Sequence, residues 1–297
     1  MNGDFVDAEK ATVNVLSPAM KYGALVFEGI CSYWNEQQQQ AYLFRLDEHL
    51  LRLQDSMRIM RFDAEYDIAE LGEIVRRTVE LNGLRGDSHI RLSAWVDGDG
   101  TMDRAGPISL MCAAVGRRPR TLDDRKVTAA VSSWRRIDDR SMPPRIKSAA
   151  NYGNSRLALM QAKADGYDEV IIPGTDGKVS EGAGACLFIV RDGAAATPPV
   201  TSGILESVTR ASLIELLRNG LDVPFQERVI DRTELYVAQE VFLCGSSYEV
   251  TPVTSVDRIR VGGGEPGPVT KKLWDAYEAA VRGTTPDHSE WRRAVFT

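Results

Sequence analysis

The segment from Gly116 to Asp124 interrupts the apolar pattern of the chain near its middle. Its sequence, GRRPRTLDD, contains Pro119 and has no apolar period, which is typical of a linker. On each side of it the chain is long enough to bury a hydrophobic core of its own. We therefore expect a smaller N-terminal domain over 1–115, a linker over 116–124 and a larger C-terminal domain over 125–297.

Both parts of the chain alternate short apolar strands with amphipathic helices, which favours a mixed α/β fold. In the first part we expect a strand over 25–33, followed by a helix with Asp47 as its N-cap. The apolar residues that recur at helical spacing in that helix are Leu46, Leu50, Leu53, Met57 and Met60. In the second part we expect a helix over 154–164 and a single strand over 178–190, entered through a turn at Asp176-Gly177.

Charge and residue spacing exclude several classes of protein. The 36 Lys and Arg stand against 42 Asp and Glu, and the net charge of -6 argues against nucleic acid or an anionic membrane as partner. The N-terminus has no pattern of a secretory signal, and no apolar run is long enough to span a membrane. The four cysteines form no CxxC pair and the three histidines show no zinc spacing. We therefore expect free thiols, no metal and a cytoplasmic location.

Lys147 is the first residue that the sequence marks for chemistry. It lies between Pro143-Pro144 and the helix expected after Asn151, and small residues follow it. Close packing at such a place favours the neutral amine that Schiff-base formation with an aldehyde requires. On this segment alone, a solvated loop lysine is the commoner alternative.

Glu181 lies within an apolar stretch, between Val179 and the run from Cys186 to Val190. A buried carboxylate is costly unless a cation pairs with it. A protonated pyridine nitrogen would be such a cation, and the carboxylate would keep a pyridine-ring cofactor an electron sink. A structural ion pair with an arginine is an equal alternative.

Two segments are suited to bind a phosphate or another small anion. Ser207 to Arg210 opens a helix, where free amide groups and hydroxyls attract anions. Ser246 and Ser247 follow a strand in a tight turn that offers hydroxyl and amide groups. Each segment also fits an ordinary cap or turn. Arg52 lies off the leucine stripe of its helix, so a solvated arginine is the simpler interpretation of that residue.

Taken together, these segments resemble the branched-chain aminotransferases, a family of pyridoxal-phosphate enzymes of fold type IV. The matching motifs, which extend over nearly the whole chain, are Tyr22-Gly…Val26-Phe-Glu-Gly29, Phe44-Arg…Glu48-His…Arg52-Leu, His89-Ile-Arg91, Ser132-Ser-Trp134, Lys147…Asn151-Tyr152, Gly166-Tyr-Asp-Glu169, Ser180-Glu-Gly-Ala-Gly184, Thr197-Pro-Pro199, Ile204-Leu…Val208-Thr-Arg210, Glu240-Val-Phe…Gly245, Glu249-Val-Thr-Pro252 and Gly267-Pro-Val-Thr-Lys271. The resemblance implies a two-domain fold of the D-amino acid aminotransferase type. Pyridoxal 5'-phosphate would lie in the interdomain cleft, bound by the larger C-terminal domain.

The resemblance also implies roles for single residues. Lys147 would bind the cofactor aldehyde as a Schiff base and move the α-proton of the substrate, Glu181 would face the pyridine nitrogen, and Tyr152 would hydrogen-bond the phenolic oxygen. The residues that would hold the phosphate are Arg52, Ser207, Val208, Thr209 and Ser246. The residues that would bind the substrate are Tyr22, Phe27, Cys31, His89, Arg91, Ser246 and Ser247, with Arg91 and Tyr22 at its carboxylate.

The sequence departs from the family at a few positions. Cys31 stands where members usually have Arg, His89 where they have Tyr, and Cys186 where they have Asn. The segment 116–120 replaces an aromatic loop that helps to cover an apolar side chain, and Ser207 replaces a glycine. We expect all of these changes except Ser207 to bear on the substrate side, and none of them to alter the core of the cofactor site; a serine at position 207 is compatible with the same turn.

The implied activity is amino transfer between an amino acid, branched-chain or with a related unusual side chain, and a 2-oxo acid such as 2-oxoglutarate. We expect a homodimer or a higher homo-oligomer, with no nucleic-acid or membrane partner. Three alternatives stay open: a lyase of the aminodeoxychorismate type, a transaminase for D-amino acids or (R)-amines, and a non-catalytic paralogue. Arg91 and the segment 132–134 favour the transaminase over the lyase.

Overall fold

The computed structural model describes residues 1–296, and its backbone contacts divide them into two compact units. The first unit comprises residues 1–119, 146–150 and 279–296, and the second comprises 120–145 and 151–278. Lys147 therefore groups with the N-terminal part of the chain, from which it is distant in sequence. The domain limits expected from the sequence stay a prediction, because contact density alone does not test which segments fold independently.

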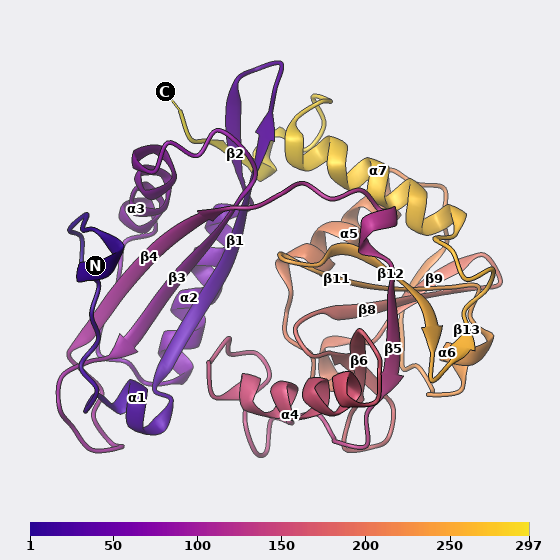
Figure 1. The fold of residues 1–297 in the computed structure, drawn as a ribbon, viewed down its shortest axis with the longest axis horizontal. Helices are drawn as coiled ribbons and strands as arrows, with labels where there is room; N and C mark the ends of the chain where they lie inside the picture. The colour runs from indigo at the N-terminus through magenta and orange to yellow at the C-terminus, as the bar shows by residue number, and fades with distance from the viewer. Residues whose placement is uncertain (297) are drawn as a thin grey trace. The chain divides into compact units, whose positions relative to one another are not determined.

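The first unit is built on a five-stranded antiparallel sheet with the strand order β14-β2-β1-β3-β4 (Figure 1). Its strands are β1 (Leu25–Asn35), β2 (Gln40–Phe44), β3 (Ser88–Val96), β4 (Ile108–Gly116) and β14 (Arg292–Ala294). The register of β1 with β3 pairs Phe27 with Ser93, Gly29 with Arg91 and Cys31 with His89. Because side chains alternate between the two faces of a strand, these paired residues all lie on one face of the sheet.

The opposite face of this sheet carries the hydrophobic core of the first unit. Helices α2 (Leu46–Ile59) and α3 (Ile68–Leu81) pack against it. The buried side chains of α2 include Leu46, Leu50, Leu53 and Met57 of the predicted stripe, whereas its last member, Met60, is the C-cap of the helix. Asp47 is not the N-cap: Arg45, in the left-handed conformation, precedes the helix, and Asp47 lies in the first turn. At this position its negative charge interacts favourably with the positive end of the helix dipole and stabilises the helix.

The second unit is built on a nine-stranded mixed sheet with the strand order β10-β9-β8-β11-β12-β5-β6-β7, and β13 pairs with β12 beside this path. Its strands are β5 (Val127–Val131), β6 (Glu169–Pro173), β7 (Val179–Gly182), β8 (Cys186–Arg191), β9 (Ala194–Thr197), β10 (Phe225–Glu227), β11 (Glu240–Gly245), β12 (Glu249–Val256) and β13 (Ile259–Arg260). β5 runs parallel to β6 and β12, and β9 runs parallel to β10.

The stretch 178–190, expected to be a single strand, forms the two strands β7 and β8. The amide of Gly182 donates a hydrogen bond to the carbonyl oxygen of Ala185 at 2.7 Å, so the chain turns between the two strands. A Cβ atom at Gly182 would come within 3.2 Å of that oxygen, which explains why the turn needs a glycine. As a result Glu181 lies near the end of β7, and Cys186 opens β8.

The helices of the second unit begin with α4 (Asn151–Ala164), which packs on β6 and starts at Asn151 rather than at the expected Asn154. α5 (Val208–Asn219) packs on β11. The other helical segments of the chain are α1 (Pro18–Tyr22), α6 (Glu234–Val237), α7 (Pro268–Arg282), and the 3-10 helices η1 (Ala8–Lys10), η2 (Asp123–Arg125), η3 (Val200–Ser202) and η4 (Ser289–Trp291).

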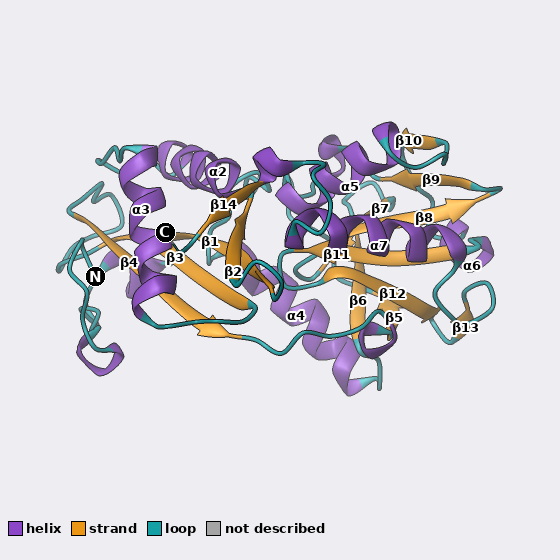
Figure 2. Cartoon of the chain, turned by 90° about the horizontal axis from the view of Figure 1, so that it is seen from above, coloured by secondary structure: helices purple, strands orange, loops and turns teal. Residues whose placement is uncertain are grey.

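Each unit thus combines a β-sheet with packed helices, which confirms the mixed α/β class predicted from the sequence (Figure 2). Among residues 1–296, no helix has both the length and the apolar character that a membrane crossing requires.

Candidate active site

Lys147 is fixed by backbone pairing with the beginning of β1. Its carbonyl oxygen accepts a hydrogen bond from the amide of Phe27 at 2.9 Å, and its own amide donates to Ser56 Oγ at 3.1 Å. β2 pairs with β1 only from Ser32 onward, so the first half of β1 has an open edge, and residues 146–150 occupy it. A lysine whose backbone is held in this way presents its amine in a narrow range of directions.

The ring of Phe27 lies beside two cationic side chains. Lys147 Nζ is 5.1 Å and Arg91 Cζ is 3.8 Å from the ring centroid, distances at which the ring face attracts a cation. Lys147 is half-buried, whereas Arg91 is exposed. The sheet face that carries Phe27 therefore holds a lysine amine and, next to it, a guanidinium suited to bind a carboxylate in a bidentate manner.

A buried carboxylate, Glu28, lies on the other face of β1. It accepts hydrogen bonds from Arg52 Nε at 2.8 Å and Arg52 Nη2 at 2.6 Å, and its Oε2 lies 2.7 Å from His49 Nδ1. Burial raises the pKa of Glu28, but the charge and hydrogen bonds of Arg52 and the hydrogen bond of His49 outweigh it and hold this pKa well below its usual 4.5. The side chain of Arg52 is only 11% exposed, so the interpretation of Arg52 as a solvated arginine is wrong.

His89 packs over Gly29 on the same sheet face as Phe27. A Cβ atom at position 29 would come within 3.0 Å of His89 Nε2, so only glycine leaves room for the ring as it stands. Burial, with the charges of Arg91 and Arg117, lowers the pKa of His89 from 6.5 to about 4. The imidazole is therefore neutral at neutral pH. Its cross-strand partner Cys31 is buried.

Tyr22 ends α1 and is 45% exposed. Gly23, with a φ of 73°, caps the helix, and a Cβ atom there would lie 3.2 Å from the side chain of Ala150. The end of α1 is therefore a neighbour of the segment 146–150. Within the first unit, the structure thus brings Tyr22, Phe27, Cys31, His89 and Arg91 beside the segment of Lys147 or onto the strands that support it. Arg52 instead lies on α2 and pairs with Glu28 on the other face of the sheet.

Glu181 is buried in the second unit and is held from three directions. Arg136 Nη2 lies 2.7 Å from Oε1, and Oε2 accepts hydrogen bonds from the amide of Leu205 at 3.1 Å and from Cys186 Sγ at 3.7 Å. The ion pair with an arginine, considered as an alternative from the sequence, is therefore present. It does not exclude a further donor, because each carboxylate oxygen has two lone pairs.

Cys186, expected to bear on the substrate side, contacts the carboxylate of Glu181 with its thiol. The turn between β7 and β8 returns the chain beside Glu181, and a single continuous strand would not do so. Arg136 was not singled out from the sequence at all. It follows the motif Ser132-Ser-Trp134, but no local signal distinguishes it from the neighbouring Arg135.

The start of α5 has the features of an anion site. Ser207 Oγ accepts a hydrogen bond from the amide of Arg210 at 3.2 Å, so this hydroxyl serves as the N-cap. The amides of Val208 and Thr209 belong to the first turn, whose N–H groups have no acceptor within the helix. Thr209 is buried. A phosphate at this helix start would meet both free amides and the positive end of the dipole.

The remaining predicted contacts of the second unit, Tyr152, Ser246 and Ser247, lie at the ends of elements. Tyr152 is the second residue of α4 and is half-buried. Asn151 Nδ2 donates to the carbonyl oxygen of Pro143 at 3.0 Å, which closes the loop before the helix. Ser246 is half-buried and Ser247 exposed in the turn that joins β11 to β12.

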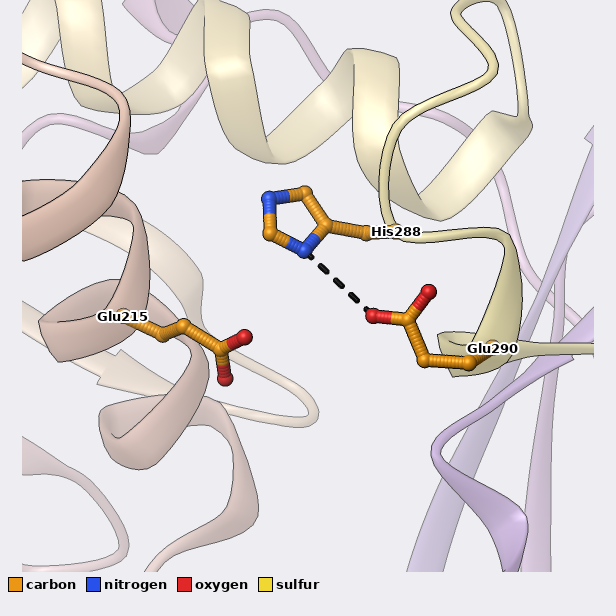
Figure 3. Close-up of side chains that lie close together, drawn as sticks. All are labelled: Glu215, His288 and Glu290. Atoms are coloured by element: carbon orange, nitrogen blue, oxygen red, sulfur yellow. Dashed lines mark ion pairs between the residues drawn. The ribbon is translucent and has the colours of Figure 1, made fainter.

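His288, in the C-terminal part of the first unit, pairs with a carboxylate. Its Nδ1 lies 3.6 Å from Glu290 Oε1 (Figure 3). Its ring stacks on Trp291 with a centroid distance of 3.9 Å. Two ligand groups from one unit are fewer than the three protein ligands of a zinc site, so we assign no metal role to this pair.

The residue types present fit pyridoxal phosphate. The first unit contributes a positioned amine at Lys147, and the second contributes a phenol at Tyr152 and a helix start at Val208 with free amides. Glu181 is the most specific feature, because a carboxylate that is buried in a sheet and paired with a guanidinium suits a protonated ring nitrogen.

Comparison with known proteins gives the same result. The model of the family "Amino-transferase class IV" matches residues 25–256. The chain is 40% identical to a probable branched-chain-amino-acid aminotransferase of Aquifex aeolicus, over 99% of this chain and 95% of that protein. The crystal structure of a branched-chain amino acid aminotransferase from Thermobaculum terrenum in its PLP form superposes with a TM-score of 0.93 at 39% identity, covering 100% of this chain and 97% of that one. A branched-chain aminotransferase from Thermoproteus uzoniensis, solved with norvaline, superposes with a TM-score of 0.94 at 39% identity, covering 99% and 98%.

Fold, site and relatives together define a pyridoxal-phosphate-dependent aminotransferase. The chain belongs to the amino-transferase class IV family and, within it, to the branched-chain aminotransferases. The family, the cofactor and the transaminase activity predicted from the sequence are thereby confirmed.

Proposed function

We propose that Lys147 is the residue to which the cofactor is joined and the group that moves the α-proton of the substrate. When bound, pyridoxal phosphate supplies an aldehyde for the amino group and an electron-withdrawing ring. The observation that carries the proposal is the place of Lys147: its backbone is anchored to β1 and Ser56, and its amine lies 5.1 Å from the ring of Phe27 beside Arg91. A positioned acid or base of this kind contributes about 10²–10⁴ in rate.

The second unit supplies groups that orient the cofactor. Glu181 pairs with the protonated ring nitrogen, and Tyr152 donates a hydrogen bond to the phenolic oxygen. The phosphate is held by the amides and hydroxyls of Ser207, Val208, Thr209 and Ser246, together with Arg52. Support comes from the burial of Glu181 and from the free amides at the start of α5.

The substrate is held mainly by groups on the sheet face of the first unit. Arg91 binds the α-carboxylate, with help from Tyr22 and the backbone at Ser246 and Ser247. Phe27, Cys31 and His89 line the side-chain part of the site. Support comes from the register of β1 with β3, which puts these residues on the face that also carries the amine of Lys147.

The physiological donor is an amino acid with a branched or a related polar or unusual side chain, and the acceptor is a 2-oxo acid such as 2-oxoglutarate. The relatives named as branched-chain aminotransferases support a donor with a branched side chain. The departures at Cys31 and His89 support a donor with a polar or unusual side chain. We also propose a cytoplasmic homodimer or higher homo-oligomer. Sedimentation of the purified protein measures its assembly, and cell fractionation measures its location.

Borohydride reduction of the cofactor-loaded enzyme, followed by peptide mapping, tests the central assignment. The pyridoxyl group is expected on Lys147, and Lys147→Ala is expected to bind the cofactor without becoming labelled there. Lys163 and Lys178 lie in the second unit and serve as internal controls. A label on either of them, with Lys147 unmodified, disproves the assignment.

A further inference from the structure

Glu181 is held by a set of donors of unequal strength. Oε1 faces the guanidinium of Arg136 at 2.7 Å, and both side chains are almost fully buried, at 7% and 5% exposure. Oε2 accepts one backbone hydrogen bond, from Leu205, and one contact from a thiol, Cys186. The thiol hydrogen has a second possible acceptor in the carbonyl oxygen of Leu205, at 3.6 Å. Since a thiol is a weak donor and the amide of Leu205 is neutral, Arg136 supplies the charge-assisted contact in this set.

The buried guanidinium is itself fixed in place. The backbone amide of Arg136 donates to the carbonyl oxygen of Pro173 at 2.8 Å, and Arg136 Nη1 donates to Ser155 Oγ at 3.3 Å. Pro173 ends β6, and Ser155 lies on α4. The position of the guanidinium, and with it the direction of Glu181 Oε1, is therefore set by two separate elements of the second unit.

A carboxylate and a ring nitrogen that face each other share one proton, and the proton stays on the partner with the higher proton affinity. A nearby positive charge stabilises the ionised carboxylate and lowers its affinity for a proton. If the proton moves to the carboxylate, the ring loses its charge and becomes a weaker electron sink. The same cation is also needed to compensate the burial of the carboxylate.

We infer that Arg136 is a positioning residue for Glu181, and that it keeps the shared proton on the ring nitrogen of the bound cofactor rather than on the carboxylate. This inference rests on the proposed pairing of Glu181 with the ring nitrogen. Cys186 adds to this dependence: its thiol is a weaker donor to Oε2 than an amide would be, so the ionised state of Glu181 depends more strongly on Arg136.

The test is nitrogen NMR of the holoenzyme loaded with pyridoxal phosphate that is isotopically labelled at its ring nitrogen, because the chemical shift separates protonated from unprotonated rings. The wild type and Arg136→Lys, which keeps the charge, are expected near the protonated reference. Arg136→Gln, which keeps a neutral donor, is expected to move a large part of the way toward the unprotonated reference. Adding Cys186→Asn to Arg136→Gln is expected to move the signal back, because an amide donates a stronger hydrogen bond to Oε2.

Two results would overturn the inference. One is a ring-nitrogen chemical shift of the wild-type holoenzyme at the unprotonated reference value; this measurement needs no variant. The other is an Arg136→Gln signal identical to that of the wild type, because a purely structural ion pair changes thermal stability but not the ring nitrogen. Borohydride mapping on the same samples keeps the two proposals apart: a label on Lys147 with an unchanged ring signal refutes the role of Arg136 and leaves the proposed function intact.

Discussion

Arg52 donates two hydrogen bonds to the buried carboxylate of Glu28, from Nε to Oε1 at 2.8 Å and from Nη2 to Oε2 at 2.6 Å. The guanidinium on α2 is thereby oriented by a strand residue rather than by solvent. Glu28 also binds His49, so one carboxylate holds two polar side chains of α2. This arrangement turns a residue that looks solvated in the sequence into one of fixed direction.

Glu28→Gln is expected to destabilise the protein by about 3–5 kcal/mol, because it removes one partner of a buried ion pair and leaves the charge of Arg52 uncompensated. Urea unfolding at neutral pH measures the change. The low pKa of Glu28 means that its contribution is fully present above pH 4.5 and is lost as the pH falls below that value. The difference between the wild type and Glu28→Gln should therefore shrink in acid. A difference that grows there contradicts the assignment.

Arg52→Ala is expected to weaken cofactor affinity by about tenfold or more, since a charge-assisted hydrogen bond contributes about 1.5–3 kcal/mol. Equilibrium binding of pyridoxal phosphate measures the effect, and the order of preference among amino donors should not change. Arg58, on the same helix but 79% exposed, gives a matched control in Arg58→Ala. Equal affinities for wild type and Arg52→Ala would remove Arg52 from the phosphate site.

His89 should make stability depend on pH between about 4 and 6.5. Its pKa is lowered from 6.5 to about 4 in the folded protein, so the unfolded chain binds its proton first as the pH falls. Stability is therefore fully present above 6.5 and declines below it. His89→Phe should reduce this decline, measured as the shift of the urea midpoint between the two ends of the range. Burial also lowers the pKa of His49, so this second histidine should account for part of the decline that remains in His89→Phe. A His89→Phe profile parallel to that of the wild type would contradict the neutral imidazole.

Donor preference should differ from that of an enzyme tuned to aliphatic side chains. A hydrophobic pocket gains only about 1–3 kcal/mol of binding free energy per methylene of the substrate. Replacing its usual lining at Cys31, His89 and 116–120 is therefore expected to erase much of the discrimination among aliphatic donor side chains. We expect measurable but moderate activity with leucine, isoleucine and valine, and a higher kcat/KM with a polar, aromatic or unusual donor. A panel of L- and D-donors with 2-oxoglutarate and pyruvate as acceptors measures this. A clear optimum for the three aliphatic amino acids would refute it.

His89→Tyr, which installs the residue that the family usually carries, is the matched variant for that panel. It should shift the preference toward aliphatic donors and leave cofactor affinity unchanged, because position 89 contacts Gly29 rather than any group proposed to hold the cofactor. Gly29→Ala gives the converse control. Its methyl group would meet the imidazole at 3.0 Å and displace it, so the preference of the wild type should be lost.

Much of the local structure is predictable from the sequence because it depends on near neighbours. The stripe of α2 and the Ser207 cap of α5 follow from residues three or four positions apart. The sequence also indicates the chemical groups that the cofactor needs. Lys147 stands out because small residues follow it, and Glu181 because it is a carboxylate within an apolar stretch. The missed turn between β7 and β8 shows the limit of this approach, because an apolar stretch does not reveal where a buried chain reverses.

By itself, then, the sequence determined the mixed α/β class, the family and the chemical groups available to the cofactor. Only the tertiary structure decided which groups meet. It paired Arg52 with Glu28, Glu181 with Arg136 and Cys186, and the segment of Lys147 with the open edge of β1. The physical reason is that these contacts join residues distant in the chain, and sheet register and burial, rather than local periodicity, determine which of them come together.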